Sequence, residues 1–322
     1  MEKVDIAPGM CYSLPEIAIE MDVMTLKKGI YLCLLLALMC VWSGCSKNAA
    51  EAVPTETLTL QATEVETELP TEAPTEEPTE PPTEPVEDRA RELIRSGDYE
   101  GALELLETEP ENEETEFLRL RARIGDVEVG KQVVLGHFEQ DDVSENGTEE
   151  IIWVAIAKEE NRVFLLSLNC LDSRRYNDVK DGPVTWAESE LRGWLNEEFC
   201  NSAFTETEQR LLTETELVTL DNEKYGTPGG ENTVDRVFLL SMEEVDAYLD
   251  RGLRYGHVTA YADNRGAASN ASDNGWWWLR SPGKVRRAAC YVDALGKPSY
   301  YGYVVHRSGW SVRPAMWIDL SV

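Results

Sequence analysis

The spacing of apolar positions changes several times along the chain, and each change predicts a different kind of structure. A run of 14 apolar residues fills positions 29–42, and the next 45 residues are polar and rich in proline. Over residues 88–123 apolar side chains recur at spacings of three and four, which is typical of helices. From residue 130 onward, short segments rich in Val, Ile, Leu and Phe alternate with polar turns, which is typical of strands.

The helical part predicts a hairpin over residues 88–124. Its sequence ARELIRSGDYEGALELLE (residues 90–107) has two apolar stripes separated by Gly97-Asp98-Tyr99, and it resembles one tetratricopeptide hairpin. A single repeat of this kind cannot bury its apolar face alone. We therefore interpret it as a stalk or cap, with a binding array as the alternative.

The last part, residues 130–322, is predicted to be an α+β domain of short antiparallel strands, because strands cluster at both of its ends and helices lie between them. Capping boxes predict three helix starts, at Thr185 with Glu188, Thr205 with Glu208, and Ser241 with Glu244. The predicted strands are 132–138, 151–157, 162–168, 237–241, 276–279, 288–292, 300–305 and 311–318.

The N-terminal 45 residues have the pattern of a targeting signal. Lys27 and Lys28 precede the apolar run, which is too short to span a bilayer comfortably and has the length of a signal-peptide core. The run ends in Trp42-Ser43-Gly44-Cys45, which resembles a bacterial lipobox, although Trp42 stands where a Leu-like residue is usual. This resemblance implies cleavage before Cys45 and lipidation of its thiol; the alternatives are an uncleaved anchor and a buried helix.

Charge is distributed very unevenly over the 322 residues. The chain has 30 Lys+Arg and 60 Asp+Glu, a net charge of −30, which argues against nucleic acid as a partner. Residues 51–88 contain 12 acids, no Lys or Arg and seven of the 15 prolines. Residues 46–87 are therefore predicted to be a disordered tether, which in polyproline II could reach on the order of 120 Å.

Four motifs carry a resemblance to a known family over about residues 130–322. They are TWAESELRGWLNEEF (185–199), DRVFLLSMEEV (235–245), GWWWLRSPG (275–283) and SVRPAMWIDL (311–320). In this order they resemble an uncharacterised bacterial extracellular domain of the FLLS…WWLRSPG…VRPA type, frequent on lipoproteins. More distantly, this type is similar to the C-type-lectin-like fold of formylglycine-generating enzymes. The resemblance implies a lectin-like recognition domain with two to three helices and no established reaction.

Catalytic chemistry has little support in the sequence, and no catalytic residue is predicted. Formylglycine-generating enzymes use two cysteines near the C-terminus, whereas only Cys290 lies in that part of this chain. The three histidines are far apart, and HExxH, GxSxG and P-loop motifs are absent. An enzyme acting on envelope glycans or peptides stays the alternative, as does a structural envelope protein.

The C-terminal 60 residues favour binding. Residues 263–322 contain eight Lys+Arg, four acids and nine of the 27 aromatic residues, and arginine beside exposed aromatic rings is typical of binding surfaces. The candidate ligand-binding residues are Trp276, Arg286, Arg287, Tyr300, Tyr301, Tyr303, His306 and Arg307. The residues assigned a structural role are Trp277, Trp278, Arg280 and Arg313. Strand alternation places Tyr301 and Tyr303 on one face and Tyr300 on the other.

No metal site or cofactor is predicted, although two groups of oxygen ligands suit calcium. They are Asp221, Asn222, Glu223, Glu231, Asn232 and Asp235, and Asp263, Asn264, Asp273 and Asn274. Solvated loops are the favoured interpretation of both. The sequence thus predicts a lipid-anchored protein on the outer face of a bacterial cell membrane that binds a glycan or a protein.

Overall fold

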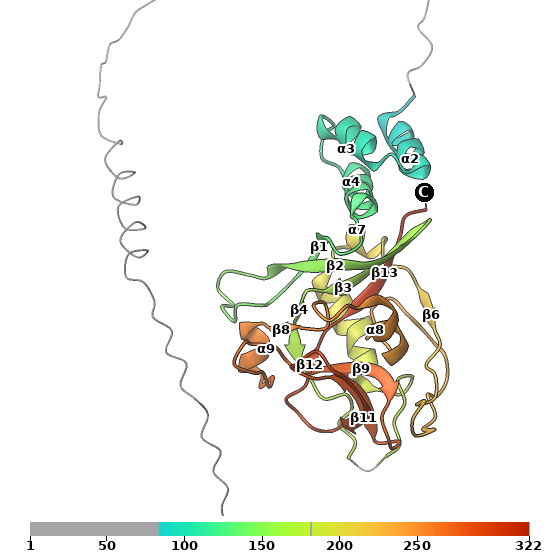
Figure 1. Ribbon diagram of the computed structural model, residues 1–322. Helices are drawn as coiled ribbons and strands as arrows, with labels where there is room; N and C mark the ends of the chain where they lie inside the picture. Colours follow the sequence, from blue (N-terminus) through green and yellow to red (C-terminus); the bar gives the residue numbers. More distant parts are fainter. Residues whose placement is uncertain (1–83, 181, 322) are drawn as a thin grey trace, which may run out of the picture. The chain divides into compact units, whose positions relative to one another are not determined.

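The computed structural model describes residues 84–321 except residue 181, and these form an α+β structure (Figure 1). All described residues belong to one compact unit. The predicted signal peptide, Cys45 and nearly all of the predicted tether lie outside the described residues. In the described part, no helix has the length and apolar character needed to cross a membrane.

Three helices begin the described part. The predicted hairpin corresponds to α2 (Val86–Ser96) and α3 (Tyr99–Glu107), and α4 (Glu113–Asp126) adds a third helix. Gly97 ends α2 in the left-handed region, at φ +81°, where glycine is favoured. Asn112 begins α4, since its side chain accepts hydrogen bonds from the amides of two first-turn residues.

These helices pack against one another and against the rest of the unit. The side chains buried among them are Ala90, Ile94, Ala102, Leu106, Leu118 and Ala122. Arg210, which follows α7 (Glu206–Gln209), pairs with Glu114 at 3.1 Å and lies 3.9 Å above the ring of Phe117. Arg121 donates a hydrogen bond to the carbonyl of Ser321. The domain thus covers an apolar face that one helical repeat leaves open.

A four-stranded antiparallel sheet joins the two ends of the domain. Its order is β1 (Gln132–Phe138), β2 (Glu149–Glu159), β3 (Arg162–Ser167) and β13 (Ala315–Asp319). The first three strands confirm the strands predicted at 132–138, 151–157 and 162–168. Because the last strand pairs with β3, segments about 150 residues apart in sequence form one sheet.

A second sheet carries most of the residues considered below. Its order is β11 (Pro298–Val304), β10 (Ala288–Val292), β9 (Trp277–Pro282), β12 (Ser311–Val312) and β5 (Asp172–Ser173). Neighbouring strands are antiparallel except β12 and β9, which are parallel. Figure 1 shows β9, β11 and β12 on the side of the unit away from β1 and β2.

The single strand predicted at 311–318 is wrong. The segment divides into β12 and β13, which belong to different sheets. Arg313 and Pro314 lie between them, both buried. Proline has no amide hydrogen for a strand ladder, while its carbonyl accepts a hydrogen bond from the Ser167 amide at 2.9 Å. The chain changes sheets at this point.

The middle of the domain is helical, with more short helices than the two or three predicted. The helices are α5 (Glu190–Trp194), the π-helix η1 (Leu195–Phe199), α6 (Cys200–Ala203), α7, α8 (Met242–Tyr248) and α9 (Ala260–Asn264). Of these, α5, η1 and α6 follow one another without a break.

Two of the three predicted helix starts are confirmed. The capping boxes of Thr205 and Ser241 form at the starts of α7 and α8. Thr185 also hydrogen-bonds to Glu188, at 3.1 Å, but this pair closes a turn, and the helix begins after Ser189.

The strand predicted at 237–241 is also wrong, although its apolar residues are buried. Only Phe238 forms a bridge there, to Ala315. The apolar pattern of residues 237–241 correctly indicates burial. A strand also needs a neighbouring strand with which to form a continuous ladder of hydrogen bonds, and this segment has none. Two small sheets complete the domain: β4 (Asn169–Cys170) with β8 (His257–Val258), and β6 (Thr215–Leu217) with β7 (Thr233–Asp235).

Candidate functional site

Four aromatic side chains, one exposed, two half-buried and one buried, line an open hollow of about 550 Å³ beside β10 and β11. We call it the Trp310 hollow. It is lined by Ala268, Trp276, Tyr291, Tyr303, Arg307, Ser308, Gly309 and Trp310.

Trp310 lies at the centre of the rings in this hollow. Its ring centroid is 4.4 Å from that of Tyr291, 4.8 Å from that of Tyr303 and 4.9 Å from that of the buried Trp278. Only 9% of Trp310 is exposed, against 43% of Tyr303. The floor of the hollow is therefore a packed tryptophan, and its wall is a tyrosine with much of its surface open to solvent.

Backbone hydrogen bonds fix the position of Trp310. Its carbonyl accepts a hydrogen bond from the Arg174 amide at 3.1 Å, and the next residue, Ser311, donates one to the Trp276 carbonyl at 2.7 Å. These bonds come from β12, which lies between β9 and β5. The backbone of the aromatic floor is thus hydrogen-bonded to segments on both sides of β12.

The Trp276–Trp277–Trp278 triplet divides between the hollow and the core. Trp276 is half-buried and lines the hollow, while Trp277 and Trp278 are fully buried. The indole N–H of Trp277 donates to the carbonyl of Arg254 at 3.1 Å, and that of Trp278 donates to the carbonyl of Arg174 at 3.0 Å.

Both motif arginines are buried and hydrogen-bonded to neighbouring segments. Arg280 forms an ion pair with Glu244 of α8 and donates to the Leu239 carbonyl at 3.0 Å. Arg313 donates to the carbonyls of Ser167 at 2.9 Å and Leu253 at 2.7 Å. Burial lowers the pKa of Arg313 to about 10. Both side chains hold backbone segments in place and lie away from solvent.

A second aromatic cluster includes the two tyrosines of β11 that precede Tyr303 in the chain. We call it the Tyr–Lys cluster; it comprises Tyr225, Tyr300, Tyr301, Lys224 and Lys284. The rings of Tyr225 and Tyr301 meet edge to face at 6.2 Å, and the Lys284 ammonium lies 5.0 Å from the Tyr301 ring centroid. The Lys224 ammonium lies 4.2 Å from the Tyr300 ring centroid. In this cluster lysines lie against the ring faces.

The structure gives Tyr301 and Tyr303 different neighbours, although strand alternation places them together. Gly302 lies between them at φ +70°, which interrupts the extended backbone. A Cβ atom at this position would lie 2.6 Å from the carbonyl oxygen of Ala289. This bend directs Tyr303 to the Trp310 hollow and Tyr301 to the Tyr–Lys cluster.

The remaining candidate residues lie apart from the two clusters. Arg286 lines a separate hollow of about 290 Å³ together with Glu188 and Glu231. Arg287 is exposed, and His306 is half-buried, with no hydrogen-bond partner at its Nδ1 among the described residues. Of the eight candidates, the structure therefore brings three together: Trp276, Tyr303 and Arg307.

Two residues of the hollow, Tyr291 and Trp310, are missing from the candidates chosen from the sequence. Tyr291 lies inside a predicted strand with apolar neighbours, so its pattern indicates core. Trp310 directly precedes a family motif, and no local pattern marks it as exposed or buried. Gly309, at φ +94°, is the one local signal of a turn that exposes this edge of Trp310.

Three side chains of the first group that suits calcium form hydrogen bonds or ion pairs with other residues of the protein. Asp221 accepts a hydrogen bond from the Gly229 amide at 3.0 Å, and the Asn222 amide donates to the carbonyls of Pro282 and Tyr300. Asp235 accepts from Trp186 and pairs with Arg192 at 2.6 Å. These side chains act as ties between segments.

Among the described residues, one other group of acids brings its oxygens within 4.8 Å of one another: Glu139, Asp141 and Glu149. Glu149 accepts a hydrogen bond from the Gln140 amide at 2.6 Å, and Glu139 accepts one from the Asp142 amide at 2.7 Å. The three carboxylates thus organise the turn between β1 and β2.

Cys290 has the environment of a core thiol. It is fully buried, its sulfur lies 3.1 Å from the Pro282 carbonyl, and burial raises the pKa of the thiol to about 12. Nucleophilic cysteines need the thiolate near neutral pH. This thiol therefore offers no nucleophilic chemistry here.

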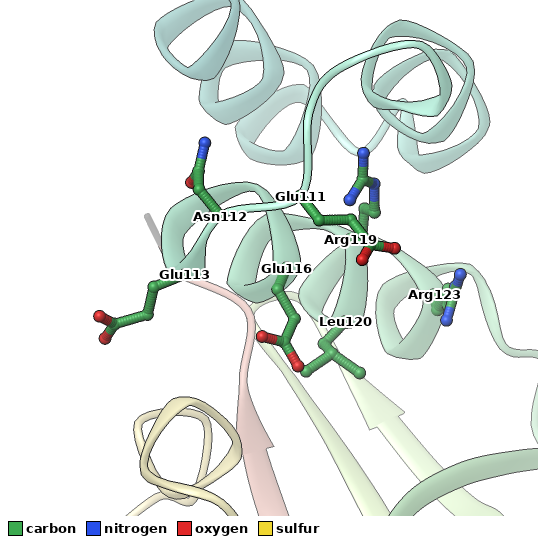
Figure 2. A pocket seen from close by; sticks show the side chains of 7 residues that line it. All are labelled: Glu111, Asn112, Glu113, Glu116, Arg119, Leu120 and Arg123. Carbon is green, nitrogen blue, oxygen red and sulfur yellow. The ribbon is translucent and has the colours of Figure 1, made fainter.

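A further hollow of about 520 Å³ lies beside α4, and Figure 2 shows its side chains, which come from α4 and the two residues before it. Most of them are charged. Arg119 already donates to the carbonyls of Leu106 and Glu109, at 2.6 and 2.7 Å, which ties the end of α3 to α4. This hollow contains no aromatic ring.

Comparison with known proteins gave one result. Residues 160–320 match the family described as Domain of unknown function (DUF6273). No curated protein and no solved structure matched the chain. The matched range includes the Trp310 hollow and the Tyr–Lys cluster and leaves out α2–α4, β1 and β2.

Proposed function

The chain belongs to the DUF6273 family, and from this premise we propose that its domain is a non-catalytic recognition module that binds a glycan in the Trp310 hollow. The observation that carries this proposal is the gathering of Trp276, Tyr291, Tyr303 and Trp310 around one open concavity.

Aromatic rings beside a concavity suit the chemistry of sugars. The apolar C–H face of a pyranose packs on a ring face, and indole and phenol groups combine apolar area with a polar edge. Rings that lose little conformational freedom on binding favour affinity. Trp310 meets that condition because its backbone is hydrogen-bonded on both sides and its ring is packed between Tyr291 and Tyr303.

Exposure separates this proposal from the structural alternative, in which the C-terminal aromatics are core. Trp277 and Trp278 are core, whereas Trp276 and Tyr303 keep surface in the hollow. A nucleophilic enzyme finds no support at Cys290, whose thiol is buried and protonated.

The proposal includes a lipid anchor at Cys45 and a location on the outer face of a bacterial cell membrane. It rests on the sequence Trp42-Ser43-Gly44-Cys45 after a 14-residue apolar run, and on the acidic, proline-rich stretch that follows. A Cys45→Ala variant tests it: labelled fatty acid should be incorporated into the wild-type protein and not into the variant. Equal labelling of both proteins would refute the anchor.

The relation to C-type-lectin-like domains is part of the proposal as well. The α+β class and the short antiparallel strands are compatible with it. An experimental structure that lacked the pairing of β3 with β13 and the sheet around β9 would argue against it.

Glycan binding is tested with the full-length protein in detergent. Trp276 and Trp310 line the hollow, so their fluorescence should change when an array-identified oligosaccharide is added. Tyr303→Ala should weaken binding about tenfold, since one ring contact contributes about 1.4 kcal/mol. Tyr301→Ala is the matched control, because it removes a more exposed tyrosine two residues away, outside the hollow. Equal losses in both variants, or no glycan bound at all, would refute the proposed function.

A further inference from the structure

We infer that the glycan bound in the Trp310 hollow carries a carboxylate, as a uronic acid or another acidic sugar does, and that Arg307 recognises it. This inference rests on the proposed function and adds the chemical class of the ligand.

The first observation is the charge of the lining. Of the eight described residues that line the hollow, Arg307 is the only one with a charged side chain, and the rest are aromatic or small. A ligand in this hollow meets one cation and no carboxylate. A neutral sugar would leave that cation unused, whereas an acidic sugar would pair with it.

The second observation is that the Arg307 guanidinium has no ion-pair partner among the described residues, 84–180 and 182–321. Other arginines nearby are held by acids: Arg265 pairs with the buried Asp172 at 2.7 Å, and Arg280 pairs with Glu244. The Arg307 side chain is exposed, and its residue is fixed by a hydrogen bond from its own amide to the Val304 carbonyl at 3.2 Å. Its backbone is therefore held in place while its donors stay free.

The third observation concerns geometry and field. A guanidinium presents parallel N–H donors that match both oxygens of one carboxylate, and such charge-assisted pairs are stronger than neutral hydrogen bonds. Residues 263–322 have a net charge of +4 within a chain of −30, so an acidic ligand is attracted to this part of the molecule. A single arginine matches one negative charge, which favours a carboxylate over a doubly charged phosphate.

The test compares sugars that differ only in charge. The full-length protein is applied to an array of neutral, carboxylate-bearing and sulfated oligosaccharides, and affinities are then measured for tetragalacturonate and its methyl ester. Wild-type protein should bind carboxylate-bearing sugars at least about tenfold more tightly than neutral ones, and this preference should shrink as salt increases.

Arg307→Gln should abolish the preference and leave the affinity for neutral sugars within about twofold of wild type. Arg307→Lys should keep part of the preference, because it keeps the charge and loses the paired donors. Arg286→Gln changes the net charge equally but lies at a different hollow, so it should keep the full preference.

The outcomes separate the two proposals. If neutral and acidic sugars bind equally, or sulfated sugars bind best, or Arg307→Gln keeps the preference, the carboxylate inference is wrong and the proposed function stands. If no oligosaccharide binds, the proposed function fails and this inference fails with it.

Discussion

Strand β11 carries tyrosines to two clusters of similar composition and different exposure. At the Trp310 hollow, tilted rings pack on a central tryptophan, and Tyr303 lines the concavity. At the Tyr–Lys cluster, the ammonium groups of Lys224 and Lys284 lie over the rings, and the Tyr300 hydroxyl donates to Asp246 at 3.4 Å. Both regions combine aromatic and cationic residues, but only at the Tyr–Lys cluster do the cations lie over the rings.

This difference shows that composition alone does not identify a binding surface. Tyr301 is 61% exposed and therefore more accessible than Tyr303. Its ring nevertheless contacts Lys284 and Tyr225, and Tyr301 does not line the Trp310 hollow. Available ring faces around a hollow are a stricter criterion than exposure.

The largest expected effect comes from the centre of the hollow. Trp310→Ala removes a ring that packs against Trp278, Tyr291 and Tyr303, and it should lower the free energy of unfolding by about 3–5 kcal/mol. Tyr301→Ala should lower it by less than about 1 kcal/mol, because that ring is mostly exposed. Urea denaturation measures both. Similar losses in the two variants would show that the clusters do not differ in packing.

The next effect tests the bend that separates the clusters. Gly302→Ala forces a left-handed backbone on alanine and brings its Cβ to 2.6 Å from the Ala289 carbonyl, so unfolding should be easier by about 3 kcal/mol. Gly147→Ala is the matched control: φ is +94°, but nothing lies within 4 Å of the added atom. It should cost only about 1 kcal/mol. If the two substitutions lower the free energy of unfolding equally, the close packing at Gly302 is not what separates Tyr301 from Tyr303.

A smaller effect tests the lysines. Lys284→Met removes a cation from beside the rings of Tyr225 and Tyr301, which should cost about 0.5–1 kcal/mol of stability. Lys297→Met, in the exposed β10–β11 turn, should change stability by less than about 0.5 kcal/mol. Neither variant should alter glycan binding. Glycan binding gained in Lys284→Met would mean that the lysine over the ring faces keeps the Tyr–Lys cluster from binding glycan.

Local patterns in the sequence predicted much of the fold. The strands β1–β3 and β10 and the helix starts at Thr205 and Ser241 follow from alternation and capping, which depend on nearby residues. The division of residues 311–318 between two sheets does not follow from local patterns, because it depends on the pairing of β13 with β3, about 150 residues away.

The sequence predicted part of the candidate site, as it predicted part of the fold. An aromatic and basic composition indicated Trp276, Tyr303 and Arg307. Trp310 lines the hollow together with these residues because β12 pairs with both β9 and β5. Tyr301 lies outside the hollow because Gly302 bends the strand. Both outcomes depend on tertiary contacts, which residue spacing does not record.

The smallest expected effect concerns the ionisation of Tyr300. Partial burial, and then the charges of Asp246, Glu223 and Glu243, raise its pKa above the ordinary value of 10.0. A group whose pKa is higher in the folded state stabilises the fold below pH 10 and loses that contribution as the pH rises through the folded pKa. Urea midpoints should therefore fall less steeply above pH 10 in Tyr300→Phe than in the wild type. Because the burial of Tyr300 is only partial, the difference should be small, and identical midpoint curves for the two proteins would mean that neither burial nor the nearby acids influence the ionisation of this ring.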